Sequence, residues 1–277
     1  MRARAITVCL AVTVCSCRVA AAQQPPPPLG AVVAALDDQR LVLSTNGSTL
    51  SGGSGGGGAS AAWLGSIGPD VVLGAGAEYQ QISNAHWTTG NFTGSLGLPG
   101  RIKTHLYVDG HEGAGDIGNR AFHYSVDSVG VLTQLTPELT VQLEERYIDV
   151  DTSHGSLPKL GLSYRATLQL TISASYAYSV GGNLGTRLGM GRIDYTGSGF
   201  NALAGLAGGP VAPAVLNLQG AVISPSPQLR EGFAGIGKTF GRTDWLLLGD
   251  YQDVSGTKRT SIALTCTVHL HAQGHAP

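Results

Sequence analysis

The sequence predicts an all-β protein, an antiparallel up-and-down transmembrane β-barrel of about fourteen strands, with twelve strands as the alternative. The main evidence is an alternation of apolar and polar side chains with a period of two, clearest in 168–180 and 257–271. In the first of these segments, Leu170 and Ile172 alternate with Thr171 and Ser173. Successive side chains of a strand point to opposite faces, so each such segment has one apolar and one polar face.

Composition supports the same fold class. Only 13% of the residues are charged, the formal net charge is −1, and 41 of the 277 residues are glycine. Globular domains average about 25% charged residues, yet no apolar run is long enough to cross a membrane as a helix. A closed barrel is the other structure that a bilayer admits. The balanced charge gives no basic surface for nucleic acid. A soluble secreted β-sandwich would also alternate and stays open as an alternative.

The first 22 residues have the pattern of a secretory signal peptide. Arg2 and Arg4 precede an apolar run over 5–15, and small residues at 20–22 form a cleavage site before Gln23. Three of the four cysteines would leave with this signal. Cys266 would then be alone, so no disulfide is expected in the mature chain.

The remaining chain is expected to divide into a Pro/Gly/Ser-rich segment over 23–56, a barrel over 57–271 and a tail over 272–277. The segment 23–56 is expected to include a first strand, and the glycine- and serine-rich part of it, 46–56, is expected to be a flexible loop. Turn residues separate the expected strands, which cover 31–45, 57–67, 70–82, 86–98, 101–110, 119–135, 139–150, 158–165, 168–180, 184–195, 199–208, 229–240, 243–253 and 257–271.

Connections of two kinds alternate along the chain. Tight turns, such as that at 99–100, alternate with looser, Gly-, Ser- or Asp-containing connections such as 46–56, 111–118 and 209–228. Outer-membrane barrels have short periplasmic turns and longer outer loops, and an even strand number places both termini on the periplasmic side. The pattern therefore favours the bacterial outer membrane as the location and outer-membrane lipid as the surroundings.

The parity of each strand predicts its two faces. In 70–82, Leu73 and Tyr79 are expected to face lipid, and Glu78 the lumen. In 119–135, Phe122, Tyr124 and Val126 are expected to face lipid, opposite His123, Ser125 and Asp127. Glu145 and Lys238 share the parity of apolar neighbours, so each is expected to need a bulge or an interfacial position. The charged residues expected to line the pore are Glu78, Lys103, Asp127, Arg165 and Arg187.

The C-terminal part of the chain resembles a known family. The segments YRATLQLTISASYAYS, GTRLGMGRIDY, FNALAGLAGGP, GFAGIGKTFGRTDWLLLGDYQDVSG and TSIALTCTVHL are similar to those of YaiO-type outer-membrane β-barrels, which are related to the barrels of bacterial polysaccharide-secretion proteins. The resemblance covers about residues 60–271 and rests on strand and turn patterns. It implies an outer-membrane barrel and gives no catalytic residues.

No chemistry-bearing motif is found. The nearest cluster is His105, Asp109 and His111, with His86 on the expected neighbouring strand, but no nucleophile signature accompanies it. The acidic residues Glu144, Glu145, Asp149 and Asp151 could hold calcium, although a solvated loop is the preferred interpretation. No catalytic residue, cofactor or metal site is therefore predicted.

The expected function is that of a passive channel or porin-like pore for small solutes or saccharides, with polysaccharide as a further candidate partner. The alternative from another class is a non-conducting structural or interaction barrel, plugged by 31–56 or by the connection 209–228. The substrate and the oligomeric state do not follow from the sequence.

Overall fold

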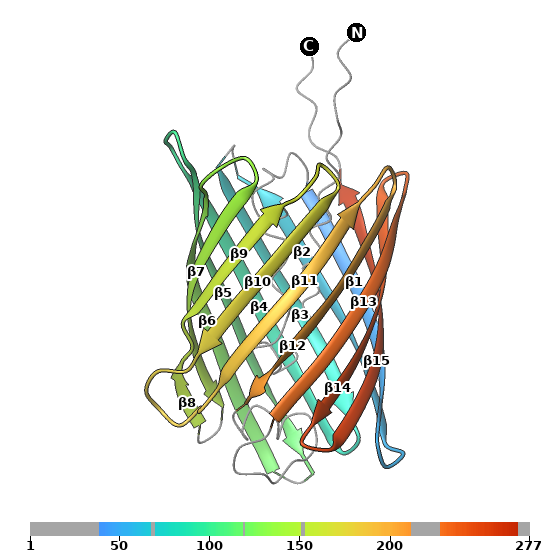
Figure 1. The fold of residues 1–277 in the computed structure, drawn as a ribbon. Helices are drawn as coiled ribbons and strands as arrows, with labels where there is room; N and C mark the ends of the chain where they lie inside the picture. Colours follow the sequence, from blue (N-terminus) through green and yellow to red (C-terminus); the bar gives the residue numbers. More distant parts are fainter. Residues whose placement is uncertain (1–38, 68–69, 119, 151–152, 212–227, 271–277) are drawn as a thin grey trace.

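The protein is one antiparallel sheet that closes on itself (Figure 1). The computed structural model describes residues 39–270 except 68–69, 119, 151–152 and 212–227. Its strands are β1 Gln39–Leu50, β2 Gly55–Ser66, β3 Val71–Ile82, β4 Ala85–Leu98, β5 Lys103–Ile117, β6 Arg120–Gln134, β7 Leu139–Val150, β8 Ser153–Ser156, β9 Lys159–Arg165, β10 Leu170–Tyr178, β11 Arg187–Thr196, β12 Phe200–Pro210, β13 Gln228–Phe240, β14 Thr243–Val254 and β15 Thr257–Leu270. The expected signal peptide and the tail 272–277 lie outside the described residues.

The wall has fourteen positions, which confirms the predicted count. Except between β8 and β9, each strand pairs with its neighbour in sequence, and β1 pairs with β15 to close the barrel. β8 and β9 both pair with β7 and occupy one position between them. They are separated by Leu157 and Pro158, and proline has no N–H for a sheet ladder. Pairing of β1 with β15 removes the two free edges of an open sheet. On the side of β8 away from β7, the described residues form an isolated bridge between Ser156 and Val180.

The first strand differs from its predicted position. It covers 39–50 instead of 31–45, and only the turn 51–54 separates it from β2. The expected loop 46–56 is therefore mostly strand. Glycine makes this possible because a Cβ on Gly56 would lie 2.3 Å from the carbonyl oxygen of Gln81 on the neighbouring strand. Residues 39–56 belong to the wall or its turn, so the hypothesis that they plug the barrel is wrong. Residues 31–38 lie outside the described part.

The connection expected at 111–118 is also mostly strand. β5 extends to Ile117 and pairs with β6 along its whole length. Residues 118–119 alone therefore connect β5 to β6. The predicted contrast between tight turns and looser loops is therefore wrong here and at 46–56. Both segments are rich in small residues. Composition alone predicts loops for such segments, but small residues are also found in paired strands where backbones approach closely.

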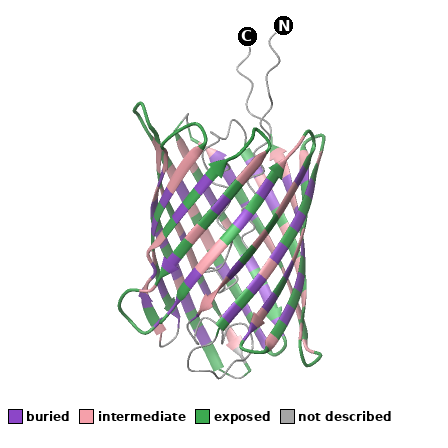
Figure 2. Cartoon of the chain, viewed as in Figure 1, coloured by how far each residue is buried: buried purple, intermediate pink, exposed green. Residues whose placement is uncertain are grey.

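The two faces of the wall differ in chemistry, as Figure 2 shows by the alternation of buried and exposed residues. Large apolar side chains such as Leu206 and Ile262 are 70% and 60% exposed on the outer surface. Inward positions include buried polar residues such as Thr89 and Arg192. The outer face thus has the composition of a wall in contact with lipid. The soluble sandwich is wrong, because its apolar face would be packed against a second sheet. Among the described residues there is no helix suited to crossing a membrane.

The faces of β6 are reversed relative to the prediction. Phe122, Tyr124 and Val126 are buried on the inner side, while His123 and Asp127 are exposed on the outer side. The pairing of β6 with β5 runs without a bulge, so one parity holds along the whole strand. The inner face is apolar at this end of the barrel, and hydrophobicity alone cannot distinguish it from the lipid-facing side.

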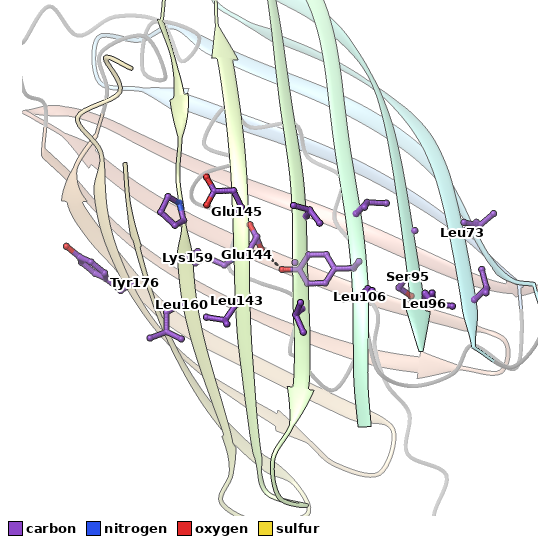
Figure 3. Close-up of a pocket in the computed structure, with 18 of the residues that line it drawn as sticks. Leu73, Ser95, Leu96, Leu106, Leu143, Glu144, Glu145, Lys159, Leu160 and Tyr176 are labelled. Carbon is purple, nitrogen blue, oxygen red and sulfur yellow. Dashed lines mark hydrogen bonds and ion pairs between the residues drawn. The ribbon is translucent and has the colours of Figure 1, made fainter. Parts of the chain in front are cut away.

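Neither Glu145 nor Lys238 requires a bulge, because β7 and β13 pair in unbroken register. Lys238 lies near the end of β13, with its ammonium 5.1 Å from the centre of the Phe240 ring, in an interfacial position. Glu145 lies at the middle of β7 on the outer face. It belongs to a groove of about 1010 Å³ that neighbours such as Leu143 and Leu160 make apolar (Figure 3).

Replacing Glu145 with leucine is expected to stabilise the barrel by about 1 kcal/mol, because a carboxylate among outward apolar residues at mid-wall is costly in lipid. The free energy of unfolding in lipid vesicles measures this effect. Asp149→Leu is the matched control, since Asp149 is exposed on the same face of β7 but next to its end. A loss of stability in Glu145→Leu with no change in the control would show that Glu145 does not face lipid.

Candidate functional site

The interior of the barrel has an apolar layer at the end opposite the start of β1 and the end of β15. We call this layer the inner apolar cluster. It consists of Ile82, Ala85, Trp87, Phe122, Tyr124, Val126, Ile148, Val150, Leu157, Ala177, Leu184, Leu188, Val211, Leu229 and Val254, with Leu50 packed against it. Most of its members are inward residues near the same end of β3, β4, β6, β7, β10, β11, β13 and β14, and Leu157, Leu184 and Val211 lie in the connections between strands.

Aromatic rings make up one side of this cluster. The Trp87 and Phe122 rings meet edge to face at a centroid distance of 6.4 Å, and Phe122 stacks with Tyr124 at 6.3 Å. The Tyr124 hydroxyl shares a hydrogen bond with Thr89. Glycine on β5 gives the Tyr124 ring its place, because a Cβ on Gly113 would lie 2.4 Å from a ring carbon. The glycine content of β5 therefore serves the inner aromatic surface.

A charged network lies on the inner face of the wall and is formed by side chains of β5, β7 and β9. The carboxylate of Glu144 accepts hydrogen bonds from Arg146 at 2.6 Å and from Lys159 and Tyr107 at 2.7 Å each. Gln142 donates to the Tyr107 hydroxyl at 2.6 Å. The side chains of Glu144, Lys159 and Arg146 are only 3%, 11% and 15% exposed. One carboxylate thus holds two cations inside the wall.

Other inward charges are also paired. On β11, Arg192 donates from Nε to Asp194 at 2.8 Å. On β14, Asp250 accepts a hydrogen bond from Ser261 at 3.1 Å. Near the end of the barrel where β1 begins and β15 ends, His269 lies 2.6 Å from Asp244, which also accepts a hydrogen bond from Thr239. Such pairs make the inner surface polar, while their opposite charges keep the net electrostatic potential in the lumen small.

The five residues predicted to line the pore lie in three different environments. Glu78 is inside the barrel, 2% exposed, and accepts a hydrogen bond from Gln80. Lys103 and Arg165 belong to the inward-facing positions of their strands. Both are exposed, because Lys103 is the first residue of β5 and Arg165 the last residue of β9, next to tight turns. Asp127 and Arg187 are on the outer face, so their assignment to the lumen is wrong. The guanidinium of Arg187 lies 5.7 Å from the centre of the Tyr178 ring, which is 44% exposed.

The residues weighed as chemical candidates do not form a catalytic cluster. Asp109 and His111 are hydrogen-bonded at 2.8 Å, whereas His86 pairs with Asp116 at 3.5 Å on the outer face. The acidic run is divided by strand alternation, with Glu144 inside and Glu145 outside, and Asp151 lies outside the described residues. Within the described ranges, no three His, Cys, Asp or Glu residues are grouped as metal ligands would be.

Comparison with solved structures identifies the fold. A mutant of the monoaromatic hydrocarbon channel TodX matches with a TM-score of 0.60 and 10% identity, covering 89% of this chain and 95% of that one. The Pseudomonas putida toluene transporter TodX matches with a TM-score of 0.56 and 10% identity, over 87% and 91%. A Pseudomonas aeruginosa FadL homologue matches with a TM-score of 0.58 and 9% identity, over 88% and 93%.

The chain has the fold of outer-membrane channels. At this level of identity, the likeness is one of architecture. No family model matches the chain, and no curated protein matches it.

Proposed function

We propose that the chain is a passive channel of the bacterial outer membrane for small, largely apolar organic molecules. The observation that carries this proposal is the inner apolar cluster, which lies at the end of the barrel opposite the start of β1 and the end of β15. In an outer-membrane barrel whose termini are periplasmic, this is the external end. A solute entering from outside would therefore meet apolar and aromatic side chains first.

The same cluster disfavours ions and saccharides. Apolar constrictions exclude ions by dewetting, and a saccharide would lose hydrogen bonds to water without finding replacements there. The monoaromatic hydrocarbons named for TodX are of the class that such a surface accepts. We extend that class to this chain on the basis of its own inner apolar cluster, not on the basis of the fold.

Three of the residues predicted to line the pore are compatible with this proposal. The lumen-facing Glu78 and the rim residues Lys103 and Arg165 would set the polarity of the path beyond the apolar cluster. No enzymatic activity is proposed, because the solved neighbours named above are channels or their homologue. The resemblance to YaiO-type barrels belongs to this proposal as well and is compatible with a location in the outer membrane.

A non-conducting structural barrel is the second candidate. The observation in its favour is the low exposure of inward side chains, with Leu229 and Tyr124 each 1% exposed. Such a barrel would hold its interior closed to all solutes. The two candidates differ in whether apolar solutes pass, which can be measured.

Polar substitution in the apolar cluster is expected to make the barrel conduct ions. Leu229 and Val254 face each other across β13 and β14, and both are at most 5% exposed. In planar bilayers, the wild-type protein should pass little current. The double variant Leu229→Ser, Val254→Ser should pass several-fold more, because hydroxyls and added space let water enter.

Leu206→Ser is the control for the conductance experiment. Leu206 is 70% exposed on the outer face of β12, so its replacement should leave the current unchanged. A large, steady current through the wild-type protein, equal to that of the double variant, would contradict the proposal that the inner apolar cluster excludes ions.

A further inference from the structure

Gln252 has unusual surroundings inside the barrel. It lies on β14 with its side chain on the inner face, while the neighbouring Tyr251 is exposed on the outer face. The residue is 1% exposed, and neither Nε2 nor Oε1 has a hydrogen-bond partner among the described residues. Other inward glutamines differ, since Gln80 donates to Glu78 and Gln142 donates to Tyr107.

The position of Gln252 is a boundary between two kinds of surface. Val254, two residues further along the inner face of β14, belongs to the inner apolar cluster, as does Leu229 opposite it. In the other direction along the strand lies Asp250, which Ser261 and Arg259 approach at 3.1 and 3.8 Å. The amide of Gln252 therefore lies where the apolar layer meets paired charges.

Residues of opposite charge flank this amide in the same cross-strand row. Glu231 on β13 and Arg259 on β15 are its register partners, and both are at least nine-tenths buried. Charges of both signs on the two sides favour a neutral group over an ion between them. A neutral group that both donates and accepts would complement the amide, which itself offers a donor and an acceptor.

A buried amide without partners costs free energy that a ligand can recover. We propose that Gln252 recognises a neutral head group that both donates and accepts a hydrogen bond, such as a primary carboxamide, on a small molecule whose apolar body packs against Leu229 and Val254. This inference rests on the proposed function and makes it more specific. The substrates would be amphipathic molecules of low charge, beyond pure hydrocarbons.

Benzamide is a suitable probe, because it combines an aromatic body with a primary amide. N,N-dimethylbenzamide is the matched probe, since it keeps the body and the acceptor but has no N–H. Binding of each to the purified full-length barrel in detergent can be measured by equilibrium dialysis, with protein-free micelles subtracted. We expect wild-type protein to bind benzamide about tenfold more tightly than the Gln252→Leu variant, the effect of losing two neutral hydrogen bonds.

Two controls accompany this comparison. N,N-dimethylbenzamide should bind wild type and Gln252→Leu with affinities closer together than benzamide does. Thr267→Val removes another inward hydroxyl that has no partner within the described part of β15 and its neighbours, but at a different level of the wall, so it should leave benzamide binding unchanged. The slower migration of heated than of unheated protein on a gel shows that each variant is folded.

Equal binding of benzamide to folded wild-type and Gln252→Leu protein, or no binding to either, would overturn the role of Gln252. The proposed function is tested separately by uptake of an apolar dye that lacks an amide. Dye uptake without Gln252-dependent benzamide binding would refute this inference alone. Absence of dye uptake would refute the channel itself, whatever the binding result.

Discussion

Replacing Glu144 with leucine is expected to lower the free energy of unfolding of the barrel by about 3 to 5 kcal/mol, the cost of removing one partner from a buried ionic group. Arg146 and Lys159 would remain inside the wall without the carboxylate that now accepts from both. The hydroxyl of Tyr107 would lose its acceptor as well. Denaturant unfolding in detergent or lipid, followed by the change in gel mobility, measures the loss.

A triple variant separates the ionic effect from packing. Glu144→Leu combined with Arg146→Met and Lys159→Met removes all three charges while keeping apolar volume, so its stability should return close to that of the wild type. A single Glu144→Leu variant as stable as the wild type would mean that water reaches the two cations. The interior at this level would then be open and wet, contrary to the burial of these side chains.

Arginine on the outer face at mid-wall is expected to cost about 2 to 4 kcal/mol if the barrel lies in a bilayer. Leu264 is the test position, because it lies near the middle of β15 and is exposed outward. In Leu264→Arg, the folded fraction in lipid vesicles should fall sharply.

The matched substitution is Thr260→Arg on the same face of β15. Thr260 lies nearer the strand end, beside the exposed Tyr251, where the cost of arginine should be about 0 to 1 kcal/mol. Equal stability of Leu264→Arg and Thr260→Arg in lipid would contradict a membrane around this wall.

Much of the fold follows from period-two alternation and turn residues. β9 is an example, because small or polar inward positions alternate there with apolar outward positions, as in Ser163 and Leu162. β3 shows the same alternation at Glu78 and Tyr79. Tight hairpins limit the ways in which such strands can pair. The number of wall positions was therefore predictable from the sequence.

The errors occur where both faces of a strand have similar chemistry. Near its start, β6 has Phe122 and Tyr124 on the inner side, and near its other end it has Val129 and Val131 of opposite parity. Two apolar runs of opposite parity in one strand were the available signal of an apolar interior. Using that signal would have placed Asp127 on the outer face.

The interior network could not be derived from the sequence alone. Strand alternation places Glu144 and Arg146 on one face of β7, but their contact with Lys159 depends on the register between β7 and β9. The strand that pairs with β7 is interrupted at Pro158, and the alternation of side chains within each strand does not predict how β9 is aligned with β7 after this interruption. That the Gln252 amide has no hydrogen-bond partner among the described residues likewise depends on the two strands beside β14, namely β13 and β15.

Uptake of N-phenyl-1-naphthylamine by Gram-negative cells tests the central claim most directly. This apolar dye fluoresces in lipid, and an intact outer membrane slows its entry. Cells that produce the wild-type barrel should take up the dye faster than cells that produce an equal amount of assembled Leu229→Asp, Val254→Asp protein, in which the inner apolar cluster carries charge. Equal uptake by the two, at the rate of cells without the barrel, would contradict a channel for small apolar molecules.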